Sequence, residues 1–370
     1  MSSDFIPVAD PKAQVNAHEP EIIEAIERVL ASGRYILGEE VKAFEREFAD
    51  FLGAGFCIGL ASGTDAIALA LRAVGVAPGD EVITVSHSAV ATVAAVEQIG
   101  AVPVFADIDG RTGCLDPSRI APLICEETKA IVPVHIYGQP APMEEILVIA
   151  RRNNLKVVED CAQAHGAEIN GLKVGTFADA GAFSFYPTKN LGAIGDGGAA
   201  VTNSPDVAEN LRLLREYGWK ERYVSSIPGY NSRLDEIQAA ILRVKLRFLS
   251  EANARRRQIA ERYYAAIDGE RIIPPSKIEH TLHAMHLFVV RCCNRDALQN
   301  FLKGKGIGTA VHYPKAIHQQ SAYADRIKGA ANLPRTEELY ENILTLPVWP
   351  ELTDAQVERI CSTLIEWSRS

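Results

Sequence analysis

A lysine stands between an aromatic run and a series of glycines near the middle of the 370-residue chain. The segment reads Gly181-Ala-Phe-Ser184-Phe-Tyr186-Pro-Thr-Lys189-Asn-Leu-Gly and continues into further glycines. Most lysines are surface residues. A lysine held in apolar surroundings, however, has a lowered pKa and can form a Schiff base with a carbonyl group. The glycines would let the backbone pass close to a planar ligand, so Lys189 is a candidate for imine chemistry.

A second motif, Ala61-Ser62-Gly63-Thr64-Asp65, directly precedes an apolar segment of helical character. A glycine flanked by hydroxyl side chains at a helix start offers backbone N–H groups and side-chain donors to a phosphate, helped by the helix dipole. An ordinary helix N-cap is the alternative interpretation. The chain has no Walker loop and no GxGxxG sequence after an early strand.

A third motif places acidic residues at the end of an apolar run, in Val157-Val-Glu-Asp160-Cys-Ala-Gln163-Ala-His165. Ligands of open parallel sheets bind at the carboxyl ends of the strands. A carboxylate buried there needs a cationic or hydrogen-bonding partner. Capping of a following helix by Asp160 is an equal alternative.

Together the three motifs supply a phosphate site, a carboxylate for a ring nitrogen and a Schiff-base lysine. Pyridoxal phosphate needs these three groups, because its phosphate is anchored, its pyridine nitrogen is protonated and its aldehyde forms an imine. The sequence therefore predicts a pyridoxal phosphate site.

The surrounding pattern predicts an α/β fold with a mostly parallel sheet, because continuous apolar runs alternate with helical segments. Strands are expected at 81–85, 102–106, 130–136, 156–160 and 180–185, and helices at 64–73, 91–100, 143–153 and 204–217. One long helical stretch at 234–266 would connect two domains. Beyond it we expect a strand at 286–291 and helices at 295–303 and 353–367, the last capped by Thr353. We predict a large α/β domain at 1–250 and a smaller α+β domain at 251–370.

Composition limits the classes of function. The chain has 38 basic and 47 acidic residues and a net charge of −9, which argues against nucleic acid as a partner. Its seven cysteines form no CxxC pair or zinc-type array, so we expect free thiols and no metal site. Without a signal sequence or a long apolar segment, we expect a cytoplasmic protein that does not enter a membrane.

Three longer segments resemble the DegT/DnrJ/EryC1/StrS family of sugar aminotransferases. They are Asp160-Cys-Ala-Gln-Ala-His, Ser184-Phe-Tyr-Pro-Thr-Lys-Asn-Leu-Gly and Tyr230-Asn-Ser-Arg-Leu-Asp-Glu. The likeness extends from Ser32-Gly-Arg-Tyr-Ile-Leu-Gly to Leu346-Pro. The resemblance implies the aspartate-aminotransferase type of fold (fold type I) and a homodimer or higher assembly with active sites at the subunit boundary.

The resemblance also implies roles for single residues. Lys189 would be the Schiff-base lysine and proton shuttle, Asp160 would pair with the pyridine nitrogen, and Gln163 would bond the ring hydroxyl. The phosphate would be held by Ser62, Gly63, Thr64, Ser184 and, from the neighbouring subunit, Asn231. Family members that act as dehydratases replace the lysine by histidine, so Lys189 favours amino transfer.

One position departs from the commoner family pattern. Many relatives carry an aromatic residue that stacks on the pyridine ring, whereas the segment His87-Ser-Ala89-Val-Ala-Thr92 has alanine there. Stacking by the His87 imidazole is one interpretation, and a core or capping histidine is the other. Together with Tyr137-Gly-Gln-Pro and the segment 216–223, this variant resembles the subgroup that aminates C3 of dTDP-linked 3-keto-6-deoxyhexoses.

Substrate contacts are expected from two regions. His312 and Tyr313, in the strand-like segment 310–314, match a family segment that closes over the sugar, and an edge strand stopped by proline is the alternative. Tyr186 would touch the sugar or merely pack. The nucleotide diphosphate would be bound by basic and aromatic side chains, with solvated loop charges as the alternative: Arg34, Tyr35, Trp219, Lys220 and Arg222.

The expected reaction is a ping-pong transfer from L-glutamate, through the pyridoxamine phosphate form of the cofactor, to a nucleotide-linked keto sugar. It would serve the biosynthesis of amino sugars for lipopolysaccharide O-antigen, an S-layer or an antibiotic. The alternatives are a 4-keto-sugar or inosose aminotransferase and a cofactor-binding regulatory protein without turnover.

Overall fold

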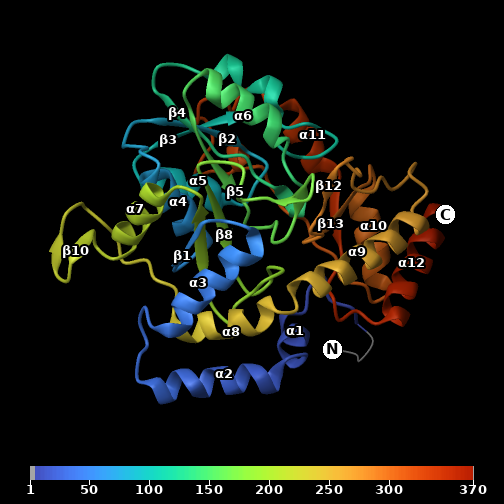
Figure 1. The fold of residues 1–370 in the computed structure, drawn as a ribbon. Helices are drawn as coiled ribbons and strands as arrows, with labels where there is room; N and C mark the ends of the chain where they lie inside the picture. The colour runs from blue at the N-terminus through green and yellow to red at the C-terminus, as the bar shows by residue number, and fades with distance from the viewer. Residues whose placement is uncertain (1–4, 370) are drawn as a thin grey trace.

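The computed structural model describes residues 5–369, and a large twisted sheet lies at its centre (Figure 1). Within the described residues this sheet has seven strands in the order β1-β9-β8-β5-β4-β2-β3. Neighbouring strands are parallel except where β9 pairs with β1 and β8, so the prediction of a mostly parallel sheet is confirmed. The strands are β1 (Phe56–Leu60), β2 (Glu81–Val85), β3 (Val102–Ala106), β4 (Thr128–Ile131), β5 (Lys156–Asp160), β8 (Ala180–Ser184) and β9 (Gly198–Thr202).

Helices cover both faces of this sheet. Val158 of β5 packs into a core with α4, α5 and α7, whereas Val157 packs into a core with α6 on the other face. Phe183 of β8 extends that second side toward α3 and α8. Burial on both faces explains why the strands are continuous apolar runs. The helices are α3 (Glu39–Leu52), α4 (Gly63–Ala73), α5 (Val90–Gln98), α6 (Met143–Arg152), α7 (Pro205–Arg215) and α8 (Glu236–Leu246).

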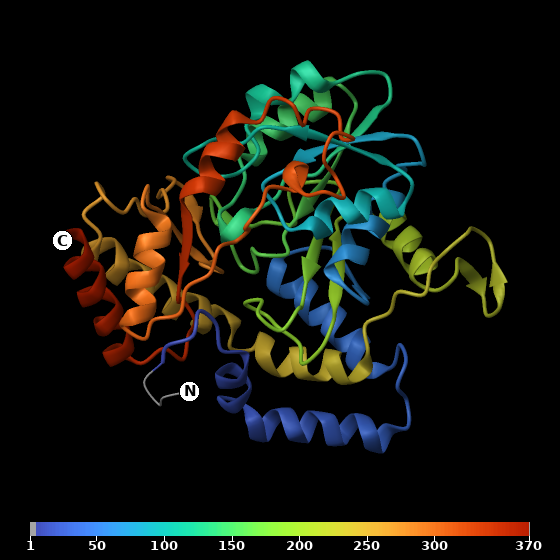
Figure 2. The same ribbon diagram turned by 180° about the vertical axis from the view of Figure 1, so that it is seen from behind.

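A separate core lies among α9, α10 and α12, which gather at one side of the molecule (Figures 1 and 2). It contains Phe288 and Leu346 from an antiparallel strand pair and takes Ile6 from the start of the chain. The elements around this core are α9 (Leu249–Ala266), β13 (Phe288–Arg291), α10 (Arg295–Gly304), β14 (Ile343–Leu346) and α12 (Asp354–Arg369). Three further elements from this part of the chain pack elsewhere. β12 (Thr281–Leu282) pairs with β6, whereas η4 (Ile317–Gln319) and α11 (Pro334–Asn342) pack against elements of the central sheet.

The remaining elements are short or lie at the edges of the sheet. The helix α2 packs on α8, through Ile22 and Ile241 among others. The pair β10–β11 forms a hairpin that projects from the body of the molecule (Figures 1 and 2). These elements are α1 (Pro11–Asn16), α2 (Glu19–Ser32), η1 (Pro117–Arg119), η2 (Ala121–Leu123), η3 (Ile136–Gly138), β6 (Glu168–Ile169), β7 (Leu172–Lys173), β10 (Trp219–Glu221) and β11 (Val224–Ser225).

Three expected elements differ from the observed ones. The strand expected at 130–136 is β4, which ends at Ile131 and is followed by an isolated bridge between Val134 and Asp160. The helical stretch 234–266 is not continuous, because α8 ends at Leu246 and α9 begins at Leu249. Phe248 lies at this break, and its ring stacks on the His18 ring at 4.0 Å, so a tertiary contact replaces the Pro or Gly that usually marks a break. The segment 310–314 forms no regular strand and has only a single bridge, between Ala310 and Thr345. The Thr353 cap is confirmed, since its Oγ1 accepts from Gln356 N.

No helix within residues 5–369 is both long enough and apolar enough to cross a membrane.

A buried glutamate joins the start of α3 to α8. The Glu236 carboxylate accepts hydrogen bonds from the backbone N–H groups of Gly38, Glu40 and Val41, at 2.7 to 3.1 Å. These are among the donors that a helix start leaves without partners. The same contact fixes the end of the loop that carries Arg34 and Tyr35.

We therefore expect Glu236→Ala to lower the free energy of unfolding by about 2–4 kcal/mol, because several buried donors lose their acceptor. Urea denaturation monitored by circular dichroism measures this loss. Glu251→Ala on the exposed side of α9 is the matched control and should leave the transition almost unchanged. Equal transitions for both variants would contradict the capping role.

Candidate active site

The three chemical motifs meet at one edge of the central sheet. Strand β5 ends at Asp160, whose register partner on the parallel strand β8 is Ala182. Strand β8 ends at Ser184, and the chain then turns to Lys189, whose backbone N–H donates to Tyr186 O at 2.8 Å. Parallel strands place their carboxyl ends at one edge of the sheet. The Asp160 carboxylate and Lys189 therefore both lie at this edge.

A cavity at this edge is lined by most of the residues predicted to hold the cofactor. Its wall also includes Ser88, Ala89 and Thr92 from the start of α5. The predicted residues that line it are Ser62, Gly63, Thr64, Asp160, Gln163, Ser184, Tyr186 and Lys189.

One end of the cavity is the first turn of α4. Ser62 Oγ accepts from Asp65 N at 3.1 Å, so the serine is an N-cap as well as a cavity residue. A Cβ on Gly63 would lie 2.5 Å from Ser184 Cβ, and a Cβ on Gly198 would lie 2.2 Å from Ser62 O. These glycines therefore allow the two loops to pack together. The result is a cluster of hydroxyl groups at a positive helix end, which suits a phosphate.

Asp160 lines the same cavity, and the residue is only 4% exposed. It accepts hydrogen bonds from Thr92 Oγ1 at 2.8 Å and from Ala162 N at 3.1 Å. Burial raises its pKa, while these two donors and the charge of Lys189 act in the opposite direction. Asp160 makes the local turn bond of a cap, but no helix follows it. A buried carboxylate of this kind is suited to a cationic ring nitrogen.

Lys189 faces the same cavity, and burial lowers its pKa to about 8 although the charge of Asp160 opposes this shift. Its neutral amine should therefore make up about a tenth of the population at pH 7 and about nine tenths at pH 9. A neutral amine is the nucleophilic form.

We accordingly expect Lys189 in the cofactor-free protein to react with acetic anhydride with a midpoint near pH 8, well below that of an ordinary exposed lysine, about 10.4. Competition labelling followed by peptide mass spectrometry measures the profile, with the exposed Lys303 as internal control. A midpoint for Lys189 above pH 10 would contradict the buried environment.

Buried polar contacts hold the turn that carries Lys189. The Asn190 side chain contacts Asn253 on α9, and its backbone O accepts from Gln14 Nε2 on α1 at 3.4 Å. The backbone O of Gly192 accepts from Lys245 Nζ on α8. Contacts from three helices thus fix the position of the lysine backbone.

Gln163 connects the cavity to the segment 310–314. Its Oε1 accepts from Tyr137 N at 2.6 Å, and its Nε2 donates to Tyr313 Oη at 2.9 Å. The Tyr137 hydroxyl donates to His312 O at 2.5 Å. His312 and Tyr313 are therefore held against the cofactor cavity by side chains from η3 and from the loop after β5.

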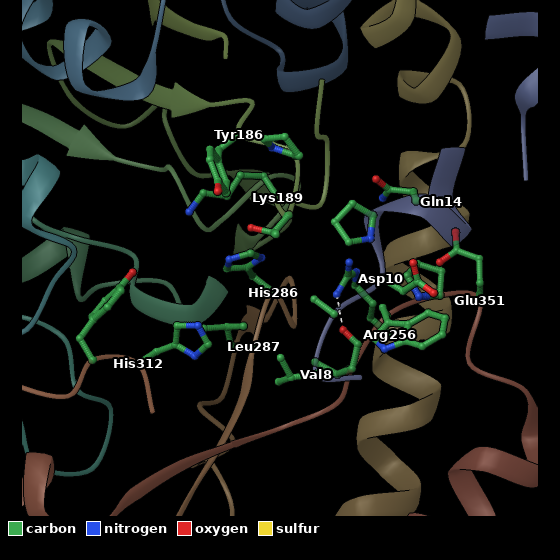
Figure 3. A pocket seen from close by; sticks show the side chains of 18 residues that line it. Val8, Asp10, Gln14, Tyr186, Lys189, Arg256, His286, Leu287, His312 and Glu351 are labelled. Atoms are coloured by element: carbon green, nitrogen blue, oxygen red, sulfur yellow. Dashed lines mark hydrogen bonds between the residues drawn. The ribbon is translucent and has the colours of Figure 1, made fainter. Parts of the chain in front are cut away.

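A second cavity lies on the other side of this lysine and is shown in Figure 3. It shares Tyr186 and Lys189 with the first cavity and is also lined by His312 and Tyr313. Figure 3 shows Arg256 and Glu351 at the end away from His312. Lys189 thus lines two cavities, one with a phosphate cradle and one with room for a further ligand.

Other predicted residues lie outside both cavities within the single chain. Trp219, Lys220 and Arg222 belong to the projecting hairpin. Arg34 and Tyr35 are exposed on the loop before α3, and the exposed Asn231 forms a bridge with Glu216. The cavity residues of one chain therefore include none of these six.

His87 does not fit the stacking interpretation. Its side chain is fully buried, between the rings of Tyr137 and Tyr340 at 5.4 and 5.1 Å, and it is not part of the cofactor cavity wall. Burial lowers its pKa to about 3, so it is a neutral core histidine. Ser88 and Ala89, which follow the end of β2 and His87, line the cavity instead.

The sequence interpretation missed Thr92, Tyr137 and Asn190. Thr92 stands in the first turn of α5, where a hydroxyl often bonds a nearby group. That signal was available in the sequence, but its partner Asp160 is distant along the chain. Tyr137 and Asn190 act through contacts that only the fold brings together.

The residues in the first cavity fit pyridoxal phosphate. Close glycine packing forms the phosphate end, Asp160 supplies a buried anion, and Lys189 supplies an amine with a lowered pKa. The fold and this set of groups define a pyridoxal-phosphate-dependent enzyme.

The comparison with known families identifies the group more closely. The model of the DegT/DnrJ/EryC1/StrS aminotransferase family matches residues 16–365. The chain belongs to this family, whose members depend on pyridoxal phosphate.

Curated relatives match over nearly their full length. A protein of Aneurinibacillus thermoaerophilus named dTDP-3-amino-3,6-dideoxy-alpha-D-galactopyranose transaminase is 46% identical, over 96% of this chain and 98% of its own. A protein of Saccharopolyspora erythraea named erythromycin biosynthesis sensory transduction protein EryC1 is also 46% identical, over 97% and 98% of the two chains.

Solved structures share the complete fold. DesV of S. venezuelae, in complex with a ketimine intermediate, has a TM-score of 0.97 and 43% identity and is covered over 99% of both chains. The structure of ntda from Bacillus subtilis with the bound cofactor PMP has a TM-score of 0.92 and 31% identity, over 100% of this chain and 86% of that one.

Proposed function

We propose that this protein is a sugar-nucleotide aminotransferase that transfers the amino group of L-glutamate to C3 of a dTDP-linked 3-keto-6-deoxyhexose. The observation that carries the proposal is that Lys189 lines both the cofactor cavity and the second cavity. A reaction between a bound cofactor and a separate substrate needs a proton carrier at the boundary between them. The relatives named as 3-amino-sugar transaminases support the choice of substrate.

In this mechanism the bound pyridoxal phosphate supplies an electron sink and carries the amino group between the two half-reactions. Ser62, Gly63, Thr64 and Ser184 bind its phosphate. Asp160 keeps its ring nitrogen protonated by providing a buried negative charge.

Lys189 Nζ would act as the base that takes the proton from Cα of the amino donor and then as the acid that returns it, with the bound cofactor supplying the electron sink. Its lowered pKa allows the amine to act as a base near neutral pH. With the keto sugar the same amine moves the proton in the opposite direction. Tyr186, His312 and Tyr313 line the second cavity on the side of this amine, and we propose that they position the sugar.

The proposal is tested by the absorbance of the holoenzyme. L-glutamate should bleach the visible band of the lysine-bound cofactor, and a dTDP-3-keto-6-deoxyhexose should restore it. A band that glutamate does not change would contradict the proposed donor. Recovery with a 4-keto sugar nucleotide or an inosose, and not with the 3-keto sugar, would establish one of those alternatives.

We also propose a homodimer with shared active sites. Asn231 and the five residues expected at the nucleotide are outside the cavities of their own chain, and all except the half-buried Trp219 are exposed, so they are available to the cavity of a second chain. Asn231 would reach the phosphate of the neighbouring site, and Arg34, Tyr35, Trp219, Lys220 and Arg222 would bind the nucleotide diphosphate. We further propose that the chain divides into domains at 1–250 and 251–370. We propose a cytoplasmic location for the protein. The product class would be amino sugars of lipopolysaccharide, of an S-layer or of an antibiotic.

The Arg222 guanidinium lies 4.9 Å from the Tyr223 ring on the hairpin. If it binds the diphosphate, Arg222→Ala should raise the KM for the sugar nucleotide about tenfold, because one charge-assisted hydrogen bond is lost. The KM for glutamate should not change. Steady-state kinetics measure both values, and the exposed Arg119→Ala is the control. An unchanged KM for the sugar nucleotide would remove Arg222 from the site.

A regulatory protein without turnover is the second candidate, because one relative is named a sensory transduction protein. Multiple turnovers with glutamate and a keto sugar would exclude a purely regulatory role.

A further inference from the structure

A histidine that the proposed mechanism does not use lies in the wall of the second cavity. His286 is 6% exposed and lines this cavity together with Lys189. Figure 3 shows its ring among Tyr186, Lys189 and His312. Its Nδ1 lies 3.1 Å from Asn190 Oδ1.

The orientation of the Asn190 amide follows from its other contacts. Asn190 Nδ2 donates to the backbone O of Ala284 and to Asn253 Oδ1, both at 2.8 Å. A backbone carbonyl can only accept, so the amide nitrogen must face Ala284 and the amide oxygen must face His286. Asn253 is fixed in the same way, since its Nδ2 donates to His165 O at 2.7 Å.

This arrangement selects one tautomer of His286. Because Asn190 Oδ1 can only accept, His286 Nδ1 must carry the proton. Burial and the positive charges of Lys189 and Arg256 hold the pKa of His286 well below its usual range. The ring is therefore neutral, and its Nε2 has a free lone pair.

We propose that His286 Nε2 accepts a hydrogen bond from a ring hydroxyl of the keto sugar in the second cavity, and that Asn190 is the positioning residue that fixes this acceptor. The inference rests on the proposed function and identifies one contact of its substrate. A neutral hydroxyl is the donor that fits. An ammonium group would be repelled by the positive charges of Lys189 and Arg256. A carboxylate has no proton to donate and would place its negative charge against the lone pair of His286 Nε2.

The tautomer can be tested on the holoenzyme without any turnover. Long-range ¹H–¹⁵N spectra of histidine-labelled protein should show His286 with a protonated Nδ1 and an unprotonated Nε2 that does not titrate between pH 6 and 8. His286→Gln assigns the signal among the nine histidines. In Asn190→Ala the tautomer should become mixed. A protonated Nε2 in the wild-type protein would overturn the proposal.

The hydroxyl contact is tested by comparing keto-sugar nucleotides that lack the hydroxyl at C2 or at C4. His286→Leu should raise the KM for the fully hydroxylated sugar about three- to tenfold, the cost of one neutral hydrogen bond. The penalty should vanish with the analogue that lacks the partner hydroxyl, and His286→Gln should restore part of the binding. An equal penalty with every analogue would overturn the proposal.

The glutamate half-reaction separates this inference from the proposed function. It is measured on the wild-type protein and needs no keto sugar. A wild-type protein that fails this half-reaction would contradict the proposed function, whereas the spectroscopic test of the tautomer would still be read independently.

Discussion

Lys189→Ala should lower the rate of amino transfer by about 10⁴-fold or more, because it removes both the proton carrier and the amine that links the cofactor. The fold should survive, since the turn is held by Asn190 and Gly192 and not by the Lys189 side chain. The 2-oxoglutarate released from L-glutamate in a single turnover measures the rate constant, because the variant has no lysine-bound band to follow.

A matched variant distinguishes this chemical loss from damage to the site. Lys303→Ala on α10 removes an exposed lysine and should retain full activity. Circular dichroism and a urea transition should be the same for both variants. A Lys189→Ala protein with a tenth of the normal rate would refute the assignment of the lysine.

Asp160→Asn should reduce both half-reactions by about 10²–10³-fold, the range found when a charge that stabilises a reacting system is removed. Asparagine keeps the approximate size of the side chain and one oxygen acceptor, for Thr92 or Ala162, but has no negative charge to hold a protonated ring nitrogen. Stopped-flow absorbance with glutamate and with keto sugar measures the two rate constants.

Thr92→Val is the graded control for this prediction. It removes the hydroxyl that donates to Asp160 at 2.8 Å but keeps the carboxylate, so we expect a loss of about three- to tenfold, the cost of one hydrogen bond. If Asp160→Asn were no slower than Thr92→Val, the charge of Asp160 would not be important for the reaction.

The central sheet could be predicted because its signal is local. Continuous apolar runs such as Val82–Val85 identify strands buried on both faces, and helical segments lie between them. The reversed strand β9 was not predicted, since its small residues Gly198, Ala199 and Ala200 have weak strand propensity and are buried by packing against α4. The break between α8 and α9 was also missed, because no Pro or Gly marks it and Phe248 at the break contacts His18, which is distant in the sequence.

In the candidate site, too, features with a local sequence signal could be predicted and features that depend on distant contacts could not. The residues of the three motifs could be located because residue type and position at strand or helix ends restrict their chemistry. His87 was ambiguous because its neighbour Tyr340 lies far away in the sequence. The motif around Lys189 includes Asn190 but does not indicate its role, since its hydrogen bonds reach the distant residues Asn253 and Ala284. Long-range polar contacts of this kind have no periodic signal.

The way in which the lysine turn is fastened has a practical consequence for handling the protein. Gln14, Lys245 and Asn253, which fasten the turn, are not among the described residues that line the cofactor cavity. Stripping the cofactor should therefore leave the turn ordered. Reconstitution should then proceed without a refolding lag, so that isotopically labelled or fluorescent analogues of the cofactor can be exchanged into the intact protein.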